Sequence, residues 1–165
     1  MNVSEPGVGN LTVTFFGRPA ANLGPDFMIA VMPDTQCYSA NIDGGTTAMF
    51  TSQTDWIVSQ RAASNIVYAA QLGDIVNYGD TNHDGTPDYN GEWLNATNAL
   101  YRLENPLTTG LPNGIPYGAA VGNHDESPNG DATGTTTFYN QFFGTAHFAD
   151  YSEKHPHRGH SVHRQ

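Results

Sequence analysis

The sequence predicts an α/β fold in which a mostly parallel sheet is flanked by helices. Three short apolar segments of strand length, at 27–32, 66–72 and 115–121, alternate with two segments of helical spacing, near 53–64 and 92–104. This order requires parallel strands joined by right-handed crossovers. A chain of 165 residues is also long enough to form one domain with a buried core.

The first strand and the first helix carry the most specific structural expectations. Segment 27–32 is apolar throughout, which predicts a central strand buried on both faces. For the helix that follows, Ser52 or Thr54 is the expected N-cap, and Trp56 and Ile57 are the expected buried anchors.

Composition divides the chain into three regions. Residues 1–25 form an N-terminal extension or the end of a preceding module, and residues 26–150 contain the strands and helices of a partial domain. Residues 151–165 carry four of the seven histidines and almost no apolar residue. We therefore expect a disordered or aberrant tail after residue 150.

The charge and cysteine content exclude several classes of protein. Acidic residues outnumber basic ones 16 to 6, which argues against direct binding to a nucleic-acid backbone. No apolar run approaches the roughly 18 residues of a membrane span, and the single cysteine, Cys37, excludes an internal disulfide framework. Low lysine content and abundant Asn, Thr and Gly favour a secreted or cell-surface protein whose leader peptide lies outside this chain.

Polar side chains follow each of the three predicted strands. The three clusters are 34–36, 74–77 and 123–125, and they lie about 40 to 50 residues apart in a fold whose parallel strands end at one edge. Alone, the segment 121–125 would equally suit a turn. Carboxylates gathered at one edge repel unless a cation compensates them, and oxygen ligands suit Mg, Mn, Fe(II) or Zn. Asp74 follows the middle strand and is the candidate to bridge two ions.

These clusters resemble the first three motifs of the calcineurin-like metallophosphoesterases, which are written DxH, GDxx[DN] and GNH[DE]. The matching segments are Pro33-Asp34-Thr35-Gln36, Gly73-Asp74-Ile75-Val76-Asn77 and Gly122-Asn123-His124-Asp125, and the first has the PDTQ form of one branch of the family. The resemblance implies the N-terminal half of a four-layer sandwich with two divalent metal ions. By the same resemblance, Asp34 and Gln36 ligate the first ion, Asp74 bridges the two, and Asn123 ligates the second.

The resemblance also implies the chemistry of the site. The expected reaction is hydrolysis of a phosphate mono- or diester, with the phosphoester as substrate. His124 would contact the phosphoryl group or protonate the leaving oxygen, and Asn77 would help to orient it. Asp125 completes the implied set of catalytic residues.

The chain departs from the family pattern at two places. Gln36 stands where most members have a histidine, and it could instead be a polar cap at the end of the strand. The family also supplies later histidines in a GHxH motif, whereas segment 159–163 has one residue too many between its histidines. We therefore expect a fragment of a longer parent with neighbouring domains, in which the fragment itself has impaired activity.

The hydrophilic insertion that follows the second cluster resembles an EF-hand calcium loop. The candidate Ca²⁺ ligands are oxygens of Asp80, Asn82, Asp84, Thr86 and Asp88. The twelfth position of this loop is Gly91 rather than Glu, so an ordinary polar loop or an acidic wall beside the site are the other interpretations. The alternative function is a non-catalytic secreted module that binds calcium or mediates adhesion.

Overall fold

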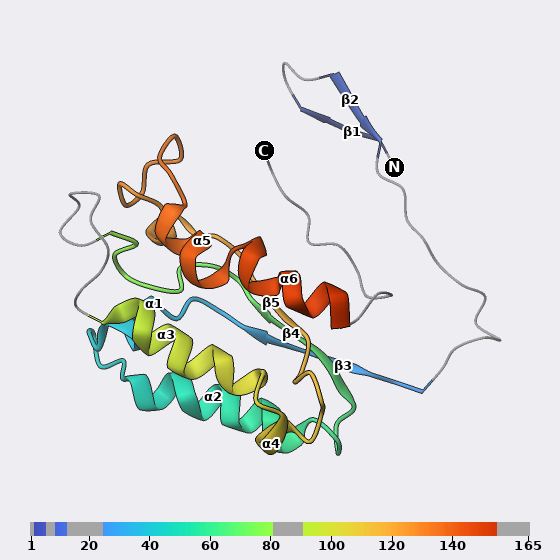
Figure 1. The fold of residues 1–165 in the computed structure, drawn as a ribbon. Coiled ribbons are helices and arrows are strands. Elements are labelled where there is room, and N and C mark those ends of the chain that lie inside the picture. The colour runs from blue at the N-terminus through green and yellow to red at the C-terminus, as the bar shows by residue number, and fades with distance from the viewer. Residues whose placement is uncertain (1, 6–8, 13–24, 81–90, 155–165) are drawn as a thin grey trace.

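A computed structural model describes the backbone of residues 2–5, 9–12, 25–80 and 91–154, and the side chains of residues 25–80 and 91–149. In these residues an antiparallel pair, β1 (Asn2–Glu5) and β2 (Gly9–Thr12), precedes a parallel three-stranded sheet in the order β3-β4-β5 (Figure 1). The parallel strands are β3 (Met28–Met32), β4 (Ile66–Gln71) and β5 (Tyr117–Ala119). The predicted α/β fold, with β4 as the middle strand, is confirmed.

The helices flank this sheet. In chain order they are α1 (Gln36–Ala40), α2 (Thr47–Gln60), α3 (Glu92–Leu100), the 3₁₀ turn η2 (Tyr101–Leu103), α4 (Pro106–Thr109), the 3₁₀ turn η3 (Asn123–Asp125), α5 (Thr137–Phe143) and α6 (Thr145–Lys154). Helices α1 to α4 lie in the crossovers between the strands of the sheet, and α5 and α6 follow the last strand. Within the described ranges, no helix combines the length and the apolar character needed to cross a membrane.

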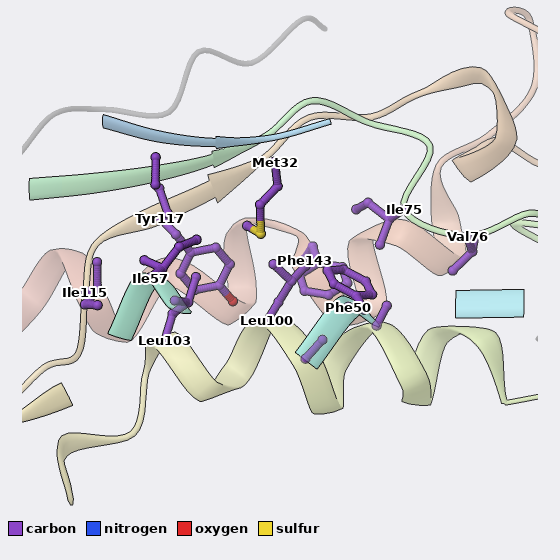
Figure 2. Close-up of a cluster of buried hydrophobic side chains, with 14 of the residues drawn as sticks. Met32, Phe50, Ile57, Ile75, Val76, Leu100, Leu103, Ile115, Tyr117 and Phe143 are labelled. Carbon is purple, nitrogen blue, oxygen red and sulfur yellow. The ribbon is translucent and has the colours of Figure 1, made fainter. Parts of the chain in front are cut away.

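The hydrophobic core lies between the sheet and the layer of helices α2 and α3. Figure 2 shows Met32 and Tyr117 extending from the strands toward Ile57, Leu100 and Leu103 on the helical side. Helix α5 joins this core because Trp93 of α3 stacks on Phe142, with the ring centroids 5.5 Å apart. Burial of these large side chains is the main term that stabilises the fold.

The expectation that the first strand is buried on both faces is wrong. Strand β3 lies at the edge of the described sheet, and its burial alternates. Ala30 and Met32 face the core, whereas Ile29 and Val31 are 50% and 56% exposed. Ile29 pairs with Tyr68 of β4, which is also exposed, so the described sheet presents an apolar outer face. Strand β3 is therefore apolar on both of its faces, and the helices cover only one of them.

The first helix begins earlier than predicted. Thr46 is the N-cap of α2, with its hydroxyl accepting the Met49 N–H at 3.3 Å, while Ser52 and Thr54 lie inside the helix. Ile57 is buried as expected, but Trp56 is 52% exposed. The buried face of α2 follows the helical spacing 50, 54 and 57, and Trp56 is one position away from that face.

Smaller differences concern the ends of elements. The helix predicted at 92–104 changes to 3₁₀ geometry after Leu100, and the strand predicted at 115–121 is regular only over β5. Helix α1, which begins at Gln36, is an additional element between the first strand and the first predicted helix. Element ends depend on tertiary contacts that local patterns do not contain.

The two faces of β3 predict opposite responses to the same charged side chain. Ala30→Lys should lower the free energy of unfolding by at least about 3 kcal/mol, because it places an unpaired ammonium group in the core. Val31→Lys, one residue along on the exposed face, should change it by less than about 0.5 kcal/mol. Urea denaturation of both variants measures the difference, and equal losses would contradict the assignment of the two faces.

Candidate active site

The three predicted polar clusters meet beyond the carboxyl ends of β3, β4 and β5. The backbone N–H of Thr35 donates to the carbonyl oxygen of Asp74 at 3.1 Å. The backbone N–H of His124 donates to Oδ1 of Asp74 at 2.9 Å. Direct hydrogen bonds therefore connect the segments after all three strands, and Asp74 is the residue common to them.

Two glycines allow the second and third segments to cross at close range. A Cβ on Gly122 would lie 2.1 Å from Oδ1 and 2.2 Å from the backbone nitrogen of Asp74. A Cβ on Gly73 would lie 2.8 Å from the nitrogen of Gly122. Gly73 and Asp74 also have positive φ angles of 99° and 50°. The left-handed conformation of a non-glycine residue costs about 1 kcal/mol or more and is typical of constrained functional sites.

Two buried carboxylates hold the backbone that follows Asp74. Oδ1 of Asp125 accepts the N–H groups of Ile75 at 2.9 Å and Val76 at 3.2 Å, and Oε2 of Glu92 accepts those of Asn77 at 2.7 Å and Tyr78 at 3.1 Å. Four consecutive N–H groups thus have carboxylate partners. These charge-assisted bonds fix the path of the chain that carries Asn77.

The Asp125 side chain occupies the interior of this arrangement. It is 1% exposed, and its Oδ2 accepts the N–H of Gly122 at 2.8 Å. Burial is the main cause that raises its pKa to about 7; three backbone N–H bonds lower this pKa, and the nearby charge of Asp74 contributes a smaller increase. Its ionisation therefore reduces stability as pH rises from the ordinary pKa of 3.8 toward 7.

His124 has a defined proton arrangement. Its Nδ1 lies 2.7 Å from the backbone carbonyl oxygen of Asn77. A carbonyl oxygen only accepts, so Nδ1 carries a proton. In the described part of the chain, no group hydrogen-bonds to Nε2, which is the nitrogen left for chemistry. The His124 ring thus contacts the backbone carbonyl group of Asn77 rather than its side-chain amide.

The remaining predicted metal ligands line the same edge. Asp34 and Asn123 are exposed, and Oδ1 of Asp34 accepts the backbone N–H of Gln36 at 2.9 Å. Oε1 of Gln36 is buried and has no hydrogen-bond partner among the described residues. A buried amide oxygen without a partner is unfavourable unless another group, such as a cation, satisfies it.

The donor set fits a hard divalent cation. Within the described ranges, no three His, Cys, Asp or Glu side chains form a group able to hold a metal ion. The predicted ligands here are two carboxylates and two amides, which supply oxygen atoms of the kind that Mg or Mn prefer. A cation at this edge would satisfy the unpartnered Oε1 of Gln36 and would reduce the repulsion between Asp74 and Asp125.

The other described histidine lies away from this edge. Nε2 of His147 is 2.7 Å from Oε1 of Glu104, and its ring stacks on Tyr101 with the centroids 4.6 Å apart. The four histidines of residues 155–165 and the candidate calcium ligands Asn82, Asp84, Thr86 and Asp88 lie outside the described residues. Asp80, the first position of that loop, is buried, and its Oδ2 accepts the Ser127 hydroxyl at 3.0 Å.

Two polar residues at the site were not anticipated from the sequence. The sequence assigns Glu92 no role at the site, yet its carboxylate accepts the N–H groups of Asn77 and Tyr78. Asn129 lies outside the three motifs, yet its side-chain amide donates to the Asn77 carbonyl oxygen at 2.9 Å. The acidic residue in the first turn of α3 was a visible signal for Glu92, whereas no local pattern indicates Asn129.

Comparison with known proteins identifies one relative of unknown activity. No family model and no solved structure matches the chain. The chain is 32% identical over 117 residues to the uncharacterized protein YvnB of Bacillus subtilis (strain 168), a match that covers 71% of this chain. The same match spans 7% of YvnB, so the similarity concerns a small part of a much longer protein.

Removal of the Asp125 carboxylate should destabilise the fold. Asp125→Ala leaves three buried N–H groups without an acceptor, and we expect the free energy of unfolding to fall by about 3 kcal/mol or more. Asp131→Ala is the control, because that side chain is exposed and bonds only within its own turn. Urea denaturation measures both variants, and an Asp125→Ala midpoint equal to that of the wild type would contradict this role.

The close crossing of the two segments makes a second prediction. Gly122→Ala should lower the free energy of unfolding by about 2 to 3 kcal/mol, because the new methyl group overlaps the Asp74 backbone. Gly110→Ala places a methyl group in open space at a φ of 68° and should cost about 1 kcal/mol. Thermal denaturation compares the two, and a larger loss at Gly110 would argue against a tight crossing.

Proposed function

We propose that this site is a metal-dependent phosphoesterase centre that hydrolyses phosphate mono- or diesters. The observation that carries the proposal is the contact of both neighbouring segments with Asp74, through Thr35 and His124, at the carboxyl edge of the parallel sheet. Ligand sites of open α/β sheets lie at this edge. The resemblance of the three segments to metallophosphoesterase motifs supports the same reaction class.

The proposed cofactors are two divalent ions from among Mn, Fe, Zn and Mg. Asp34 and Gln36 would hold the first, Asp74 would bridge the two, and Asn123 would hold the second. When bound, such ions lower the pKa of water and neutralise phosphoryl charge.

The protein groups have separate tasks in this proposal. His124 presents Nε2 to the phosphoryl group or to the leaving oxygen, because its Nδ1 is occupied by the Asn77 carbonyl oxygen. Asp125 holds the backbone of the site in place, since its side chain is buried and both of its oxygens accept hydrogen bonds from backbone N–H groups. Direct contact with the substrate therefore falls to His124 and not to Asp125.

The setting of this centre is also part of the proposal. We infer a domain of a longer secreted or cell-surface protein with neighbouring domains. The small share of YvnB that the chain matches and the lysine-poor, acidic composition support this inference. Further ligands of the second ion would then come from a part of the protein beyond the described residues, and the chain alone would retain reduced activity.

Metal-dependent hydrolysis provides the direct test. The purified chain with added Mn²⁺ should hydrolyse 4-nitrophenyl phosphate or bis(4-nitrophenyl) phosphate, and Asp74→Asn should lower kcat at least about 100-fold, because it removes the proposed bridging charge. Asp43→Asn, at an exposed aspartate outside the site, should keep wild-type activity.

Direct metal binding gives the second measurement. Electron paramagnetic resonance should detect Mn²⁺ bound to the wild type and weaker binding by Asp74→Asn. Absence of both binding and hydrolysis in the wild type, or equal activity in Asp74→Asn, would overturn the proposed function.

A further inference from the structure

Asn129 lies on a loop that is tied to the candidate site. The loop spans residues 127–135 and is closed by reciprocal backbone bonds between Ser127 and Thr135, both 2.8 Å long. The N–H of Gly130 donates to the carbonyl oxygen of Asn123 at 2.8 Å. The loop is thereby attached to the segment that carries His124.

The Asn77 carbonyl oxygen receives two side-chain donors. Nδ1 of His124 approaches it at 2.7 Å, and Nδ2 of Asn129 at 2.9 Å. The two nitrogens are 3.3 Å from each other. Because the carbonyl oxygen cannot donate, it requires a proton on each nitrogen, and a reversed Asn129 amide would place two oxygens in repulsion. The shared acceptor therefore fixes the amide orientation of Asn129 and the proton position of His124 together.

We propose that Asn129 is a positioning residue that keeps His124 in its Nδ1–H form, a role whose catalytic meaning rests on the proposed phosphoesterase function. Asn129 holds the Asn77 carbonyl oxygen where the imidazole N–H can reach it. The hydrogen bond of one ring nitrogen determines the protonation of the other, so Nε2 stays available at the sheet edge. Asn129 acts through His124 and does not touch the substrate.

Nitrogen-15 NMR of the metal-free protein tests this role without any assay of hydrolysis. Spectra are recorded where the His124 ring is neutral, and its signals are assigned by their disappearance in His124→Gln. The wild type should show a protonated Nδ1 with a slowly exchanging proton. In Asn129→Ala, exchange of that proton should rise about tenfold, the factor expected from loss of one hydrogen bond, and the Nε2–H form should become populated.

Two further variants control for effects on the fold. Asn129→Leu keeps most of the side-chain volume but removes the donor, and it should behave like Asn129→Ala. Thr133→Ala lies on the same loop, its hydroxyl bonds to Asp131, and it should keep the wild-type spectrum. Circular dichroism confirms that each variant is folded before the spectra are compared.

The outcomes separate this inference from the proposed function. An Nε2–H form in the wild type, or unchanged His124 signals in both folded Asn129 variants, would overturn the positioning role whether or not the protein hydrolyses phosphoesters. If the wild type is active, Asn129→Ala should lower kcat about tenfold with KM unchanged, as expected when a group acting in the transition state is misplaced. If the protein proves to have no phosphoesterase activity, the NMR result still tests the positioning role of Asn129.

Discussion

The geometry of the candidate site depends on two buried carboxylates, which accept hydrogen bonds from four consecutive backbone N–H groups. Asp125 accepts hydrogen bonds from two of these groups and Glu92 from the other two, so the chain after Asp74 is held at four consecutive residues. A buried carboxylate is unfavourable unless such donors surround it. The same contacts that compensate the two charges also set the position of the Asn77 carbonyl oxygen, and through it the His124 ring.

This dependence connects elements that are distant in the sequence. Glu92 belongs to the first turn of α3, Asp125 to η3, and the backbone that both bind follows β4. Each carboxylate therefore contributes both to folding and to the geometry of the site. Helix α3, the turn η3 and the end of β4 come together when the core beneath them is packed. The candidate site is therefore a product of the whole sheet-and-helix layer rather than of any one motif.

Much of this architecture is predictable from the sequence, for identifiable reasons. The alternation of apolar segments gives the parallel sheet, and the strand-end rule brings Asp74 and His124 together. The exposure of Val31 and Trp56 could not be predicted, because the identity of an apolar residue does not show whether another element packs over it. Asn129 acts on a backbone carbonyl oxygen, and no local pattern of residues indicates that contact. Glu92 is visible in the sequence only as an acidic residue in the first turn of a helix, which does not show which N–H groups it accepts. The roles of the metal ligands and of the calcium loop stay predictions.

The crossing at Gly73 and Gly122 limits how the site can vary. At both positions a side chain of any size would meet backbone atoms, so the part of the site nearest Asp74 is closed to substitution from these two points. The exposed side chains of Asp131 and Thr133, on the loop at residues 127–135, are under no such steric restriction. A family of proteins built on this arrangement would diversify its substrates at exposed loop positions of this kind, around an invariant crossing and the backbone contacts that hold it.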